Sequence, residues 1–123
     1  MKLRIRGSTI RLRLTQGEVA RVASEGRVED AIVFAPGEKL VYALALGEGP
    51  SLRARYAPGR IDVTAPRAAA REWADSDRVG MEGEQPIEGG VALKILVEKD
   101  FACLKPRSDD DDADAFPNPN DTC

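Results

Sequence analysis

The same order of predicted elements occurs twice along this chain of 123 residues. Each copy consists of two strands, a short helix and two further strands. A unit of about 45 residues cannot bury both faces of its hairpins alone, so we expect the two copies to close on each other. The predicted strands cover residues 2–6, 10–14, 28–34 and 40–46 in the first copy, and 52–56, 61–64, 79–81 and 91–97 in the second.

A short helix is expected in the middle of each copy. Thr15 precedes Glu18 by three residues, which is a capping-box pattern, and Gly26 is typical of a helix C-terminus. In the second copy, Pro66 suits a first helical position, and the alanine-rich segment that follows carries Trp73 on its buried side.

The two copies can be aligned, although few residues are identical. Setting Thr15 beside Thr64 places Arg27 near Arg78, with two extra residues in the second copy. Closure of two such units predicts an α+β fold, namely a strand-rich antiparallel barrel or sandwich with two short helices and a duplicated ββαββ unit. A generic α+β meander without duplication remains the alternative.

Charge is distributed unevenly along the chain. The first 23 residues carry six positive charges against one negative charge, whereas residues 98–123 carry eight acidic and three basic side chains. The whole chain has a net charge of −3 and a pI of about 5.1. This balance argues against a protein that coats nucleic acid or an anionic membrane.

The positive charges of the N-terminal segment are expected on one face of two paired strands. Leu3 and Ile5 alternate with basic residues, and the alternation resumes after a turn at Gly7. Guanidinium groups match the geometry of phosphate and carboxylate, so this face is a candidate anion-binding site. A solvated face whose arginines pair with acids of neighbouring strands is the alternative. The candidate residues are Lys2, Arg4, Arg6, Arg11 and Arg13.

The globular domain is expected to span residues 1–104 and to be followed by an acidic tail, rich in Pro and Asp, at 105–123. Five aspartates fall within residues 109–114, a run that is typical of a solvated terminal extension. Phe116 lies between polar stretches and could anchor the tail on the domain, with its acids facing the basic strands.

The two cysteines are 20 positions apart, and no CxxC pair is present. In a reducing cytosol they are expected to be free thiols, while a disulfide and a metal-thiolate role remain open. Clustered aspartates could hold Ca²⁺ or Mg²⁺, but their spacing does not match an EF-hand loop. The weak metal candidates are Cys103, Cys123, Asp110 and Asp112.

The absence of histidine excludes His-based triads, imidazole bases and His-rich metal sites. No serine lies in a GxSxG context and no glycine motif would cradle a phosphate, so the sequence does not favour an enzyme, and no cofactor is expected. The N-terminus lacks the apolar core of a secretory signal, and the apolar run at 40–46 is too short to cross a membrane. We therefore expect a cytoplasmic protein.

Two resemblances add to these expectations. Residues 60–79 are similar to the strand–Pro–helix–loop–strand pattern of swapped-hairpin barrels of the AbrB type, which are dimeric DNA-binding regulators, and this similarity bears on topology alone. Further segments are spread over nearly the whole chain: 2–7, 10–15, 42–44, Pro66, 72–73, 77–80, 96–104 and 116–119. Through them the chain resembles a family of small bacterial proteins with a domain of unknown function. That family supplies no catalytic residue, but the resemblance includes part of the tail and favours its docking on the domain.

These observations together predict a small cytoplasmic binding or interaction protein. Its arginine-lined anion-binding face is expected to be covered by its own acidic tail. The expected partner is an anionic ligand or an acidic protein surface, rather than a nucleic acid or a membrane. The alternative is a thiol- or metal-dependent protein that uses Cys103, Cys123 and the Asp cluster.

Overall fold

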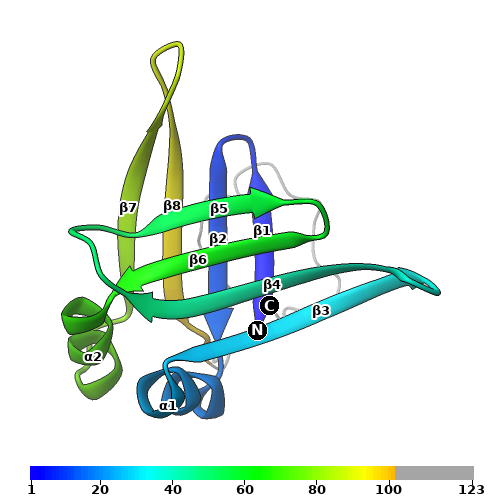
Figure 1. The fold of residues 1–123 in the computed structure, drawn as a ribbon. Helices are drawn as coiled ribbons and strands as arrows, with labels where there is room; N and C mark the ends of the chain where they lie inside the picture. Colours follow the sequence, from blue (N-terminus) through cyan, green and yellow to red (C-terminus); the bar gives the residue numbers. More distant parts are fainter. Residues whose placement is uncertain (102–123) are drawn as a thin grey trace, which may run out of the picture.

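The computed structural model describes residues 1–101, which form eight strands and two helices (Figure 1). Their order is the predicted one, and the fold is α+β. The first half contains β1 (Lys2–Arg6), β2 (Thr9–Leu14), α1 (Gln16–Glu25), β3 (Arg27–Ala35) and β4 (Glu38–Gly47). The second half contains β5 (Arg53–Ala57), β6 (Arg60–Pro66), α2 (Arg67–Asp75), β7 (Gly80–Ile87) and β8 (Val91–Lys99).

The strands form two four-stranded sheets, each built from one hairpin of each half. Sheet A has the order β1–β2–β8–β7, and sheet B has the order β3–β4–β6–β5. The hairpins are antiparallel, but they meet through parallel pairs, β2 with β8 and β4 with β6. The two halves therefore close on each other by exchanging hairpins.

The sheets face each other as a sandwich, and the strands of sheet B run across those of sheet A (Figure 1). Each sheet is mixed rather than purely antiparallel, and the two sheets do not close into a barrel. Of the two predicted architectures the sandwich is therefore the correct one, and the barrel is not. Long-range parallel pairing between the halves, which no local pattern encodes, makes the sheets mixed.

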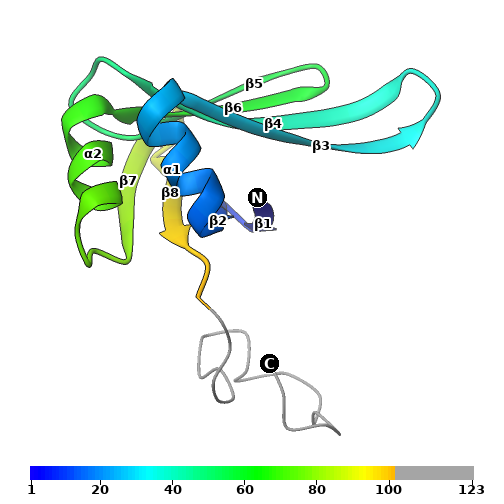
Figure 2. The same cartoon turned by 90° about the horizontal axis from the view of Figure 1, so that it is seen from below.

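Both helices lie at the same end of the sandwich and pack against each other (Figures 1 and 2). α1 contacts β2, β3 and β4, and α2 contacts β4, β6 and β7, so each helix touches strands of both sheets. The outward faces of the two sheets are not covered by either helix (Figure 2). Within residues 1–101, neither helix is both long and apolar enough to cross a membrane.

The backbone pairing relates the two halves position by position. Leu12 pairs with Val97 in sheet A as Val63 pairs with Leu44 in sheet B. Leu12 therefore corresponds to Val63, 51 positions later, and Leu44 corresponds to Val97, 53 positions later. This correspondence lets each surface of sheet A be compared with a matched surface of sheet B in the same molecule.

The same correspondence corrects the alignment made from the sequence. Thr15 is equivalent to Pro66, because these residues directly precede α1 and α2, and it is not equivalent to Thr64. Two extra residues are present in the second half, as predicted, and they fall between the start of α2 and the start of β7. The alignment was wrong by two positions because matching Thr with Thr ignored the role of Pro66 at the helix start.

The core lies between the inner faces of the sheets and beneath the helices. Val22 and Trp73 occupy equivalent positions on α1 and α2, and both are fully buried. The Trp73 Nε1 donates a hydrogen bond of 3.0 Å to the backbone carbonyl of Val79. The other large side chains that are fully buried are Leu12, Leu14, Leu44, Val63, Ile95 and Val97.

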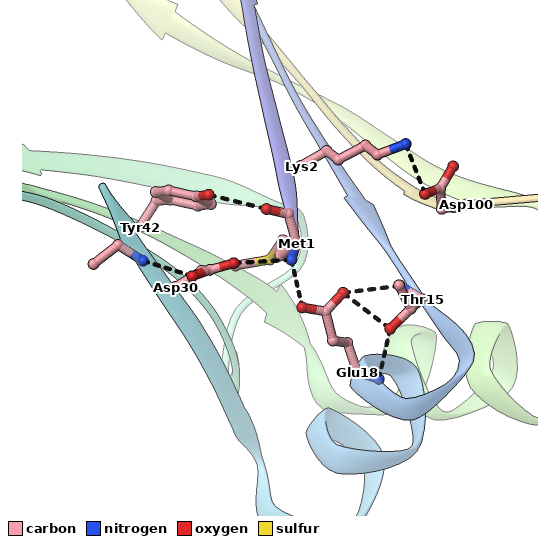
Figure 3. Close-up of polar contacts among 8 residues, drawn as sticks. Met1, Lys2, Thr15, Glu18, Asp30, Tyr42 and Asp100 are labelled. Carbon is pink, nitrogen blue, oxygen red and sulfur yellow. Dashed lines mark hydrogen bonds and ion pairs between the residues drawn. The ribbon is translucent and has the colours of Figure 1, made fainter. Parts of the chain in front are cut away.

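Polar contacts attach the start of β1 to α1 and to sheet B (Figure 3). Thr15 and Glu18 form the predicted capping box: the Thr15 N–H donates to Glu18 Oε1 at 2.9 Å, and the Glu18 N–H donates to Thr15 Oγ1 at 3.3 Å. The Met1 amine donates to the Glu18 carboxylate and, at 3.1 Å, to Asp30. The Tyr42 hydroxyl donates to the Met1 carbonyl at 3.0 Å.

Replacing Glu18 with glutamine is expected to lower the free energy of unfolding by about 1 kcal/mol at pH 7. Burial raises the pKa of Glu18, but hydrogen bonds from the Met1 amine and from Thr15 outweigh burial and leave this pKa below its ordinary value of 4.5. The carboxylate therefore stabilises the fold fully above pH 4.5, and this contribution is lost as the pH falls through the lower folded-state pKa. Urea titrations should show a smaller difference between the two chains at pH 3 than at pH 7, and an equal difference would contradict this account.

Candidate anion-binding face

The five basic residues singled out from the sequence lie on the outer face of sheet A. Pairing of β1 with β2 places Lys2 opposite Arg13 and Arg4 opposite Arg11. Between these positions lie the buried residues of β2, which point to the opposite face because side chains alternate along a strand. We call the outward surface formed by Lys2, Arg4, Arg6, Arg11 and Arg13 the basic face.

The basic face contains two cross-strand pairs of like charge, Lys2 with Arg13 and Arg4 with Arg11. Like charges directly opposite each other on neighbouring strands are destabilising. The equivalent pairs of sheet B avoid this cost, because there Arg53 faces Thr64 and Arg55 faces Asp62.

Glu98 on β8 compensates part of the positive charge. Because β2 and β8 run parallel with Arg13 opposite Glu98, the carboxylate reaches two guanidinium groups. Its Oε1 lies 3.4 Å from Arg11 Nε and 3.5 Å from Arg13 Nε. The Arg11 Nε is buried, and its contact with Glu98 is an ion pair without hydrogen-bond alignment. One carboxylate shared by two guanidinium groups leaves this part of the face positive.

The end of the basic face adjoins the point where the chain leaves sheet A. Lys2 Nζ lies 3.1 Å from Asp100 Oδ2, directly after β8 (Figure 3). The Lys2 side chain is 70% exposed, so this pair contributes little to stability. Arg4 and Arg6 follow along β1 as exposed residues.

A pocket of about 530 Å³ opens on the same outer face, between β2, β8 and β7. Arg11 and Lys94 line it on one side, and Glu82 and Glu84 line it on the other. The outer face of sheet A therefore changes from basic at β1 and β2 to acidic at β7.

The part of the outer face of sheet B that corresponds to this pocket and to Gly80 carries a neutral ionic network instead. Arg60 Nη2 lies 3.0 Å from Asp62 Oδ1, and Arg27 Nη2 lies 2.9 Å from Glu29 Oε2. Longer contacts of 3.4 and 3.5 Å join these pairs across β4, above the buried Ala43. Hydrogen bonds from Arg60 hold the pKa of Asp62 below its usual value, and those from Arg27 do the same for Glu29. Two arginines and two acids satisfy one another here.

The sequence located the five basic residues but missed their acidic neighbours. Glu98 and Asp100 belong to the acidic C-terminal part of the chain, and only the parallel pairing of β2 with β8 brings Glu98 to Arg11 and Arg13. The metal candidates Cys103, Cys123, Asp110 and Asp112 lie outside the described residues. Residues 1–101 hold no group of three or more metal-ligating acidic, cysteine or histidine side chains.

Comparison with known protein families identifies a family for this chain. A family model described as "Family of unknown function (DUF7009)" matches residues 1–120 of the chain. No curated protein and no solved structure matches.

Proposed function

The chain belongs to the DUF7009 family, as the sequence resemblance to a domain-of-unknown-function family predicted, and we propose that it is a cytoplasmic binding module for acidic ligands. In this proposal the basic face binds a row of carboxylates or phosphates. The acidic tail of the same chain covers the face when no ligand is present. The ligand is an anionic molecule or an acidic protein segment, not duplex nucleic acid, because the chain as a whole carries a net charge of −3.

The observation that carries this proposal is the difference between the two matched sheets. Lys2 and Arg4 face the cations Arg13 and Arg11, whereas their counterparts in sheet B, Arg53 and Arg55, face a threonine and an acid. If stability alone had been selected, sheet A would be expected to show the pairing of sheet B, since opposite charges stabilise neighbouring strands and like charges destabilise them. Local arrangements that cost stability are expected where a surface binds a ligand.

The geometry of the face suits an extended acidic segment. Lys2, Arg4 and Arg6 project from alternate positions of one strand, so their spacing is about 6.8 Å. Alternate residues of an extended peptide have the same spacing. Each guanidinium can donate two parallel hydrogen bonds to one carboxylate or phosphate, which adds affinity and fixes orientation.

The experiment that tests the proposal compares the full chain with a chain ending at residue 107. Oligo-aspartate and inorganic tripolyphosphate serve as probes, and binding is measured by calorimetry at low and at moderate salt. Removing residues 108–123 is expected to raise the affinity for either probe about tenfold, since a tethered competitor is lost. The affinity should fall as salt rises. Unchanged affinity would contradict the cover, and no binding by either chain would contradict the anion site.

The thiol- or metal-dependent alternative is distinguished by a different measurement. Elemental analysis and thiol titration of the purified full chain would report bound metal and the state of Cys103 and Cys123. Stoichiometric metal, lost together with binding of the acidic probe on chelation, would favour this alternative.

A further inference from the structure

β1 is one of the two edge strands of sheet A, and its backbone N–H and C=O groups can be assigned a direction. Arg4 and Arg6 lie opposite Arg11 and Thr9 on β2. On the other side of β2, the Ser8 carbonyl accepts a hydrogen bond from the Lys94 N–H, and the Leu14 carbonyl accepts one from the Asp100 N–H. Because backbone direction alternates along a strand, odd-numbered residues of β2 bond to β1, and even-numbered residues of β1 bond back.

The backbone N–H and C=O groups of the odd-numbered residues of β1 therefore point away from β2. The Met1 carbonyl does so, and it accepts the hydrogen bond from Tyr42. The N–H and C=O groups of Leu3 and Ile5 point the same way. In residues 1–101 no hydrogen bond from another segment reaches them.

The matched edge of sheet B is closed by a side chain. Ala54 on β5 corresponds to Leu3, and the Gln85 amide bonds to both of its backbone groups: the Ala54 N–H donates to Gln85 Oε1 at 2.8 Å, and Gln85 Nε2 donates to the Ala54 carbonyl at 3.0 Å. The residue equivalent to Gln85 is Ile32, which has no amide. Within residues 1–101, a side chain thus occupies edge β5 at Ala54, whereas no side chain occupies edge β1 at the equivalent Leu3.

The space beside β1 is apolar on its inner side. The β3–β4 hairpin extends past the β1 edge in both views (Figures 1 and 2). On this hairpin Ile32 pairs with Leu40, two positions beyond the Asp30–Tyr42 pair that contacts Met1. Ile5 is 60% exposed and Ile32 is 48% exposed. A strand added to β1 would bury apolar side chains here while its alternate side chains lie beside the basic face.

The charges on β1 select the kind of strand that can be added. A second copy pairing β1 with β1 would bring Lys2, Arg4 and Arg6 against the same three cations, which blocks such an edge. An added strand must instead carry acids at the positions that face Lys2, Arg4 and Arg6, and small or apolar residues at the positions beside Ile5.

We propose that residues 110–115 of the same chain add to β1 as a fifth strand of sheet A, parallel to β1. This inference rests on the proposed function and specifies how the tail covers the basic face. The segment reads Asp-Asp-Asp-Ala-Asp-Ala, so Asp110, Asp112 and Asp114 recur at the same two-residue spacing as Lys2, Arg4 and Arg6. Asp111, Ala113 and Ala115 then fall on the inner side, with Ala113 beside Ile5 and Asp111 beside Leu3, near the start of β1.

The connection is long enough for this arrangement. β8 ends at the same end of sheet A at which β1 begins, as the Lys2–Asp100 pair shows. The added strand would lie three strand spacings from β8, about 14 Å away. The eight residues 102–109 can span about 26 Å. A segment tethered this closely has a high effective concentration at the edge and outcompetes a free peptide of similar sequence.

Amide hydrogen exchange in the full chain tests the proposal residue by residue. The Leu3 and Ile5 amides should be protected, because they donate to the added strand. Two variants of equal charge distinguish the effect of backbone pairing from the effect of losing a charge. Asp112→Asn keeps a backbone N–H at the centre of the segment, and Asp112→Pro removes it. Exchange at Leu3 and Ile5 should be at least about tenfold faster in Asp112→Pro than in Asp112→Asn.

The Arg4 and Arg6 amides, which face β2, serve as the internal control and should exchange equally slowly in both variants. Equal exchange of Leu3 and Ile5 in the two variants, or protection that depends on protein concentration, would overturn strand addition. If this inference fails while removal of residues 108–123 still raises anion affinity, charge-based covering stands and only the pairing is wrong. If the truncation has no effect either, the cover itself fails.

Discussion

Replacing Trp73 with alanine is expected to lower the free energy of unfolding by about 3–5 kcal/mol. The Trp73 side chain is 0% exposed and is the largest in the core. Its removal creates a cavity under α2. It also removes the hydrogen bond that the indole N–H donates to the Val79 carbonyl. Lys99 also loses a cation–π contact, since its Nζ lies 5.9 Å from the centre of the ring.

Urea denaturation followed by far-UV circular dichroism measures this loss, and Trp73→Phe is the matched control. Phenylalanine fills much of the same space but cannot donate to Val79, so it should cost about 1–3 kcal/mol. The equivalent substitution in the first half, Val22→Ala, removes a smaller buried side chain and should cost less than Trp73→Ala. A loss below 1 kcal/mol for Trp73→Ala would contradict the described core.

The elements that were predicted most closely are those with strong local patterns. β2 shows clear alternation, and α1 has both a capping box and Gly26 in the left-handed conformation at φ 81°. β7 was predicted only as residues 79–81, although it extends over Gly80–Ile87. Gly83 and Pro86 disfavour a strand locally, but pairing with β8 and contact with neighbouring elements override this preference. Pro86 is tolerated because β7 is an edge strand.

The candidate site was predictable only in part. Alternation along β1 and β2 placed five basic side chains on one face, because that pattern depends on neighbouring residues alone. The ion pair of Glu98 with Arg11 and Arg13 required knowledge that β8 runs parallel to β2, which joins segments more than 80 positions apart. The contrast with sheet B could likewise be recognised only after the pairing had shown that Arg4 corresponds to Arg55.

Arg4 in sheet A and Arg55 in sheet B are equivalent positions that show the difference between the two sheets most simply. Arg4 faces Arg11 in sheet A, whereas Arg55 faces Asp62 in sheet B. Changing Arg4 to glutamate would replace a like-charge pair with an opposite-charge pair, and changing Arg55 to glutamate would do the reverse. The two substitutions therefore alter the net charge equally while having opposite effects on cross-strand pairing.

Binding and stability are expected to respond in opposite ways in these two variants. In the chain ending at residue 107, Arg4→Glu should lower the affinity for oligo-aspartate by about tenfold or more, because it removes a charge-assisted contact and adds repulsion. Its free energy of unfolding should be unchanged or higher by up to about 1 kcal/mol. Arg55→Glu should leave the affinity within about twofold and should lower the stability by a similar amount.

The affinity of these two matched variants for oligo-aspartate, measured side by side at the same salt concentration, is the most direct test that the outer face of sheet A binds anions. The account predicts a large loss for Arg4→Glu and almost none for Arg55→Glu. Equal losses in the two variants would show that the probe responds to overall charge rather than to the basic face, and would contradict the account.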